Sequence, residues 1–145
     1  MKFTRKKIIL GIIFIFAIGF ICLLINRNTG LKAFEKEVLN IELPQNIEKI
    51  AMKSGIGDSG GNGDYSTYRV VFVVKTEMTI DELKKEFDNK EMTTLTHKAY
   101  SGLPFAYITK CEGSVFKSSR DFVLEFDELK GINDFSNYYF IEFIN

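Results

Sequence analysis

The pattern of hydrophobic and polar positions divides the chain into an apolar N-terminal run and a mixed remainder. Residues 8–25, from Ile8 to Ile25, form the uncharged run IILGIIFIFAIGFICLLI, in which fourteen of eighteen residues are Ile, Leu or Phe. A helix of this length spans about 27 Å, close to the hydrocarbon thickness of a bilayer. Its side chains favour insertion by about 4 to 8 kcal/mol. The run therefore predicts one transmembrane helix whose partner is the lipid bilayer.

A cleaved signal peptide is the main alternative for this run, because it also combines a basic start with an apolar stretch. The apolar core of such a peptide usually has about 7 to 15 residues and is followed by a small-x-small cleavage site. Here the run is longer, and Asn26, Arg27 and Asn28 follow it. Cys22 is preceded by Ile21 rather than by the small residue of a lipoprotein signal. We therefore expect the run to be retained as an anchor.

The charges on the two sides of the run predict its orientation. Lys2, Arg5, Lys6 and Lys7 precede it without any acid, whereas bases and acids are mixed after it. Loops rich in Lys and Arg stay in the cytoplasm. The sequence therefore predicts a single-pass protein of the cell membrane with a cytoplasmic tail at residues 1–7 and an extracytoplasmic C-terminal domain.

The composition beyond the run limits what this domain can be. Residues 28–145 contain 14 basic and 19 acidic side chains, so they offer no basic surface for nucleic acid. Cys111 is the only cysteine in them, which leaves no internal disulfide and no cysteine-based metal cluster. This length suits one hydrophobic core. The excess of Lys (15) over Arg (4) is typical of a bacterial protein with a low-GC genome.

Two helical patterns follow the run. Residues 30–40 predict a short amphipathic helix within residues 26–46, with Leu31, Phe34 and Val38 on one side, which serves as a stalk or packs on the domain. A helix lying on the membrane surface is the alternative, and the acidic residues on its polar face disfavour it. A second helix is predicted to begin after Thr79, because a Glu follows three residues later in the arrangement of a capping box. That helix is expected to reach about residue 89. Its capping and apolar positions are Thr79, Glu82, Ile80, Leu83 and Phe87.

Strand patterns occupy the rest of the domain. A weak strand at residues 47–54 and a strong one at residues 65–75 predict a long hairpin whose glycine-rich tip is residues 55–64. Three further strands are predicted at residues 103–111, 122–127 and 138–144. The last is apolar on both faces, which indicates a central or covered strand. The order predicts an α+β domain at residues 47–145, with an antiparallel sheet of four to five strands and one or two packed helices.

Two catalytic or nucleotide-binding motifs can be matched to the glycine-rich tip. Residues 55–60, GIGDSG, have the spacing of a dinucleotide-binding loop, but a strand rather than a helix follows them. Residues 57–61, GDSGG, resemble the nucleophile motif of chymotrypsin-like serine proteases, with Ser59 as the implied nucleophile. That chemistry needs a histidine and a carboxylate, and the chain's only histidine, His97, comes after the serine. Neither match predicts a complete site.

The same tip partly imitates a calcium-binding loop. Asp58, Asn62 and Asp64 supply oxygen ligands, but Gly60 stands at the third ligand position and Arg69 at the place of the bidentate Glu. No metal, cofactor or catalytic residue is therefore predicted. Glycines also serve a turning hairpin, and such tips often contact partners. The candidate contact residues are Asp58, Ser59, Asn62, Asp64 and Tyr65.

Two classes of function remain open at this point. The first is a membrane-anchored extracytoplasmic domain that binds a protein or a cell-envelope component without catalysis. The alternative is a small membrane-bound hydrolase or metal-dependent enzyme that uses Asp58, Asp64 and His97. The sequence favours the first class, because no catalytic constellation is complete.

Overall fold

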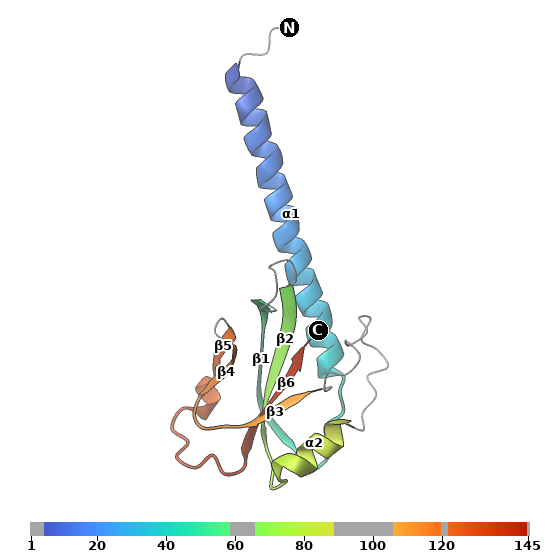
Figure 1. Ribbon diagram of the computed structural model, residues 1–145, viewed down its shortest axis with the longest axis vertical. Helices are drawn as coiled ribbons and strands as arrows, with labels where there is room; N and C mark the ends of the chain where they lie inside the picture. The colour runs from blue at the N-terminus through green and yellow to red at the C-terminus, as the bar shows by residue number, and fades with distance from the viewer. Residues whose placement is uncertain (1–4, 59–65, 89–105, 120–121, 145) are drawn as a thin grey trace.

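The computed structural model describes residues 5–58, 66–88, 106–119 and 122–144, and it has the shape of a small domain with a projecting helix (Figure 1). Helix α1 (Arg5–Leu39) projects from the domain with its N-terminal half and lies against the domain with its C-terminal end. The rest of the described chain forms two antiparallel sheets and a second helix. The predicted α+β class is therefore confirmed.

Helix α1 is one uninterrupted element of 35 residues. Its apolar part is exposed on all sides, from Ile9 through Ile25. Within the described residues it is the one helix long and apolar enough to cross a membrane. The sequence predicted a separate amphipathic helix at residues 30–40, but those residues continue the apolar helix. The polar residues at 26–29 do not end the helix. Within this stretch, the hydroxyl of Thr29 donates a hydrogen bond to the carbonyl of Ile25, one turn earlier, at 2.9 Å.

The main sheet has four antiparallel strands in the order β1-β2-β6-β3. A second, two-stranded sheet pairs β4 with β5. The strands are β1 (Glu48–Asp58), β2 (Ser66–Lys75), β3 (Tyr107–Lys110), β4 (Val115–Ser119), β5 (Phe122–Glu125) and β6 (Tyr138–Ile144). Two helical elements complete the domain: α2 (Ile80–Asp88) and the 3-10 turn η1 (Asp127–Leu129).

Comparison with the predicted strands gives three differences. The hairpin of β1 and β2 forms, but β1 extends to Asp58, so the first four residues assigned to the glycine-rich tip belong to a strand. Strand β4 was not predicted. It pairs with β5, so the strand predicted at residues 122–127 lies in the second sheet instead of the first. Strand β6 lies between β2 and β3, which confirms the central position inferred from its two apolar faces.

One face of the main sheet is covered by the helices (Figure 1). Phe34 and Val38 of α1 are buried there, together with Leu83 and Phe87 of α2. On the sheet side this core contains Val70, Phe72, Val74, Ile108, Tyr139, Ile141 and Phe143. The C-terminal end of α1 is therefore part of the domain's core, and not only a stalk beneath it.

The opposite face of the main sheet is covered by the β4–β5 hairpin and the segment that follows it. Phe116, Phe122 and Phe126 pack there against Val71, Val73 and Phe140. The rings of Phe116 and Phe140 meet edge to face with centroids 5.1 Å apart. Strands β2 and β6 are thus buried on both faces, which explains their nearly continuous apolar sequence.

The capping box at the start of α2 forms as predicted. The backbone N–H of Thr79 donates to Glu82 Oε2 at 2.8 Å, and the N–H of Glu82 donates to Thr79 Oγ1 at 3.3 Å. The hydrogen bonds that the backbone N–H and the hydroxyl of Thr79 donate to the Glu82 carboxylate lower its pKa, because they favour its charged form. Leu83 and Phe87 lie on the buried face of the helix, as their spacing predicted.

Candidate functional site

The first feature of functional interest is the part of α1 where the exposed apolar segment ends and the helix begins to contact the domain. Gly30 lies against Tyr68 of β2 so closely that a Cβ atom at Gly30 would be 2.2 Å from the tyrosine oxygen. One turn further, Glu35 accepts a hydrogen bond from the hydroxyl of Ser54 in β1. Phe34 and Val38 follow in the core. Five residues after Ile25, the helix is therefore already fixed to the sheet.

The ends of β1 and β2 lie at this same end of the domain. Asp58 pairs with Ser66, and Ile56 pairs with Tyr68, which contacts Gly30. Figure 1 shows these strand ends beside α1, on the side toward its projecting apolar part. The connection between Asp58 and Ser66 therefore begins and ends near the apolar part of α1. The sequence alone gave no indication of this location.

Of the five candidate contact residues, the structure places one in an element. Asp58 is the last residue of β1. The other four, Ser59, Asn62, Asp64 and Tyr65, lie outside the described residues, as does His97.

The glycines at the start of the predicted tip have a packing role. Gly55 and Gly57 lie in β1 with their missing side chains toward the β4–β5 hairpin. A Cβ atom at Gly55 would be 2.8 Å from Phe122 Cε2, and one at Gly57 would be 2.8 Å from Arg69 Nε. Glycine in a strand often marks such a close approach. These two glycines make room for a neighbouring ring and a guanidinium group, and they are not part of a phosphate-binding turn.

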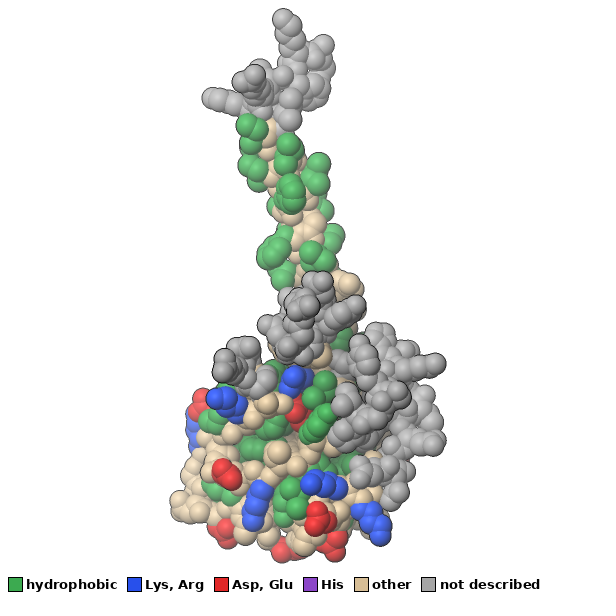
Figure 2. All heavy atoms as spheres, viewed as in Figure 1, with side chains coloured by type: hydrophobic (Ala, Val, Ile, Leu, Met, Phe, Trp, Pro, Cys, Tyr) green, Lys and Arg blue, Asp and Glu red, His purple; other side chains and the backbone are tan. Residues whose placement is uncertain are grey.

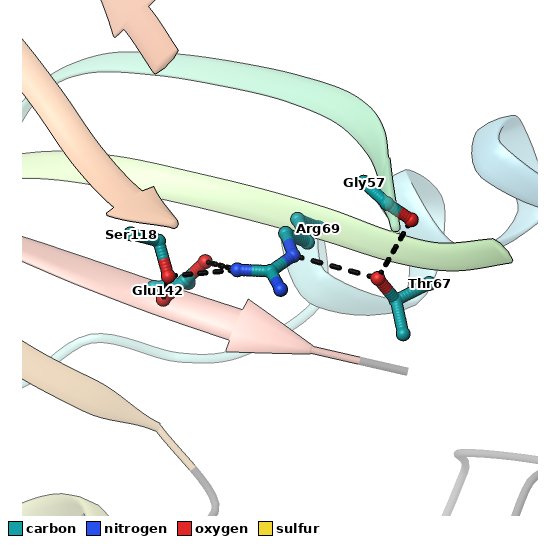
Figure 3. Close-up of polar contacts among 5 residues, drawn as sticks. All are labelled: Gly57, Thr67, Arg69, Ser118 and Glu142. Carbon is teal, nitrogen blue, oxygen red and sulfur yellow. Dashed lines mark hydrogen bonds and ion pairs between the residues drawn. The ribbon is translucent and has the colours of Figure 1, made fainter. Parts of the chain in front are cut away.

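A polar cluster that includes the buried residues Arg69 and Glu142 occupies that space (Figure 3). Arg69 Nη1 lies 2.8 Å from Glu142 Oε1 and donates to the hydroxyl of Ser118 at 2.7 Å. Ser118 in turn donates to Glu142 Oε2 at 2.7 Å. Arg69 Nε lies 3.5 Å from the hydroxyl of Thr67, which donates to the carbonyl of Gly57 at 3.0 Å. The cluster joins β1, β2 and β6 to the hairpin strand β4.

The surroundings of the cluster indicate a structural role. Arg69 and Glu142 are only 7% and 3% exposed, and their opposite charges face each other. The guanidinium carbon of Arg69 lies 5.1 Å from the ring centre of Phe122. A buried ion pair that is hydrogen-bonded in this way favours one arrangement of its strands, because separating the partners leaves an uncompensated charge. The cluster therefore fixes the β4–β5 hairpin over the main sheet.

Sequence reasoning did not identify this pair, although a signal was present. Arg69 and Glu142 each interrupt a strand that is otherwise apolar, and charged residues are seldom fully buried without a partner. Their opposite signs in two covered strands predict such a pairing. Arg69 had been considered only as a mismatch to a calcium loop.

The other groups with shifted pKa values do not suggest a catalytic site. Burial raises the pKa of the Cys111 thiol to about 12, so this cysteine is a poor nucleophile at neutral pH. On the surface, Lys130 Nζ lies 2.6 Å from Asp127 and 2.9 Å from Glu125, and the hydrogen bond to Asp127 is the main cause of the raised lysine pKa. Within the part of the chain that is described, no group of three or more metal-ligating side chains comes together.

The visible surface separates the molecule into two regions. Figure 2 shows hydrophobic side chains around the projecting part of α1, whereas Lys, Arg, Asp and Glu are interspersed over the domain.

Comparison of the chain with protein-family models, with curated proteins and with solved structures found no match.

Proposed function

We propose that this protein is a single-pass membrane protein whose C-terminal domain binds a protein or cell-envelope component outside the cytoplasm, without catalysis. The observation that carries the proposal is the change in environment along α1. Its side chains are apolar and exposed from Ile9 to Ile25, and they enter the domain's core from Phe34 onward. An exposed apolar surface of this length requires an apolar solvent, which the bilayer supplies.

The orientation follows from the charges around α1. The basic residues before the apolar part favour a cytoplasmic N-terminus, and the domain is then extracytoplasmic. Anchoring confines the domain to the membrane surface and raises its effective concentration for partners on that surface. A binding role benefits directly from this confinement.

Three buried ionisable groups of the described domain are not free to act as catalysts. Its buried charged side chains, Arg69 and Glu142, are engaged with each other. Its buried thiol, Cys111, is held in the neutral form. A hydrolase based on Asp58, Asp64 and His97 is the alternative, and it depends on residues outside the described ranges.

Topology is tested in cells stripped of their wall, with epitope tags at both ends of the chain. Protease added from outside is expected to remove the C-terminal tag and to leave the N-terminal tag on a short membrane-bound fragment. Alkaline carbonate is expected to leave the protein in the membrane pellet. Protection of the C-terminal tag would reverse the orientation, and recovery of a soluble protein would contradict the anchor.

The binding role is tested by crosslinking in intact membranes, followed by purification through the N-terminal tag. The matched control is a chain truncated after Asn28, which keeps the anchor and lacks the domain. Specific products that require the domain are expected. The same products with both chains would mean that the partner contacts the anchor, and the proposed role of the domain would be wrong.

A further inference from the structure

Helix α1, which is proposed to cross the membrane, continues without a break into the domain. Its continuity therefore determines the distance between the domain and the membrane. Gly30 is five residues beyond Ile25 in the same helix, which corresponds to about 7.5 Å of rise. The headgroup layer on each side of a bilayer is about 5 to 8 Å thick. The contact between Gly30 and Tyr68 therefore lies at the outer boundary of the headgroups.

The N-terminal end of strand β2 lies closer to the bilayer than Tyr68 does. From Tyr68 the strand runs back through Thr67 to Ser66, and each residue advances about 3.3 Å. Figure 1 shows β1 and β2 extending along α1 toward its apolar part. The strand ends, Asp58 and Ser66, are consequently about 7 Å nearer the bilayer than Tyr68. This places them within the depth of the headgroup layer.

The attachment also restricts the orientation of the domain. Three contacts within two turns of α1 connect it to the sheet: Gly30 with Tyr68, Glu35 with Ser54, and Phe34 in the core. No described residue between Ile25 and Gly30 breaks the helix. The helix and the domain therefore tilt together.

We propose that the end of the domain formed by Ile56, Thr67, Tyr68 and the neighbouring turn of α1 is seated among the phospholipid headgroups, with β1 and β2 upright on the bilayer. This inference rests on the proposed membrane anchoring and adds an interaction surface to it. Tyr68 suits the location, because tyrosine is enriched at the membrane interface. Lys32 is exposed on the adjacent turn and can approach lipid phosphates. The opposite end of the sheet then faces away from the membrane.

The absence of tryptophan from the chain allows a direct test. Ile56→Trp and Glu48→Trp place single reporters on the same strand, β1, eight residues apart, or about 26 Å. Ile56 is partly exposed and Glu48 is exposed. Each full-length variant is reconstituted into phosphatidylcholine vesicles containing lipids brominated near the headgroup, and its fluorescence is compared with that in unbrominated vesicles. Loss of emission is expected for Ile56→Trp, and unchanged emission for Glu48→Trp.

Insertion of a flexible Gly-Ser-Gly-Ser segment after Asn28 is the second measurement. It interrupts α1 before Gly30 and is expected to remove the difference between the two reporters. Both reporters are checked for an unchanged urea midpoint, and Tyr68→Trp, an aromatic exchange at the residue paired with Ile56, replaces Ile56→Trp if that midpoint falls.

The outcomes distinguish the contact of the domain with the headgroups, here called the seating, from the anchoring of α1 in the bilayer. A variant that sediments with vesicles but keeps full Ile56→Trp emission would overturn the seating and leave the anchoring intact. Equal quenching of both reporters would overturn the upright orientation. A chain that does not sediment with vesicles would overturn the proposed anchoring, and the seating with it.

Discussion

Replacement of Phe34 by alanine tests whether the C-terminal end of α1 belongs to the folded domain. Phe34 is 2% exposed and lies in the core between α1 and the main sheet, with Val38 one turn later. If this part of the helix were only a stalk, truncation of the side chain would have little effect. The structure instead predicts a large loss of stability.

The magnitude follows from the burial of the ring. Phenylalanine-to-alanine changes in a core cost about 3 to 5 kcal/mol, because transfer free energy is lost and a cavity remains. A domain of this size has a total stability of about 5 to 15 kcal/mol. Phe34→Ala is therefore expected to remove a large fraction of the free energy of unfolding.

Leu39→Ala is the matched control, because Leu39 ends the same helix but is 48% exposed. A surface change of this kind is expected to stay within about 0.5 kcal/mol of the unsubstituted chain. The assay is urea unfolding of the full chain in detergent, followed by near-ultraviolet circular dichroism and analysed at constant m-value. Equal midpoints for the two variants would refute the conclusion that α1 contributes to the core.

Three further predictions concern the buried ion pair, the buried thiol and the helix cap. Glu142→Ala is expected to lower the free energy of unfolding by about 3 to 5 kcal/mol, because Arg69 keeps a buried charge without its partner. Replacing Arg69 by Met and Glu142 by Leu together should restore most of the lost stability. A double variant as unstable as Glu142→Ala would contradict this explanation. Cys111 should resist iodoacetamide at pH 8 in the folded protein and react in urea, as measured by mass spectrometry, since burial raises its pKa to about 12. The pKa of Glu82 is lowered in the folded state, so the stability that it contributes is present above its ordinary pKa and is lost as the pH falls through the lowered value. Glu82→Gln removes the titrating carboxyl and should therefore reduce the loss of stability between neutral and acidic pH in urea titrations, and an unchanged pH profile would contradict the role of the cap.

The predicted elements that proved correct are those determined by nearby residues. The capping box at Thr79 involves residues three apart, so its hydrogen bonds can be inferred from sequence. Strand β6 was predicted with its correct bounds, because apolar residues on both of its faces indicate a covered strand. Strand β4 was not predicted, since its sequence VFKSS lacks a clear apolar alternation. It forms where Phe116 packs on Phe140, a contact that no local pattern specifies.

The glycine-rich segment shows the limit of motif matching. Several functional motifs fit residues 55–64, and each assumes that the segment is a loop. The structure assigns Gly55 and Gly57 to β1, where the rings and charges of other strands approach them. Spacing along the chain cannot separate these two uses of glycine, because both require only a missing side chain.

By itself, the sequence determined the apolar run, its length relative to a bilayer, and the helix and strands with strong local patterns, because these depend on how each segment meets its solvent and its near neighbours. Only the tertiary structure decided that α1 continues without a break into the core and that Gly30 lies against Tyr68. It also decided the pairing of Arg69 with Glu142, which are 73 positions apart. Such contacts arise from the packing of the whole chain, and the charges and apolar faces along the sequence do not specify which distant partner each will meet.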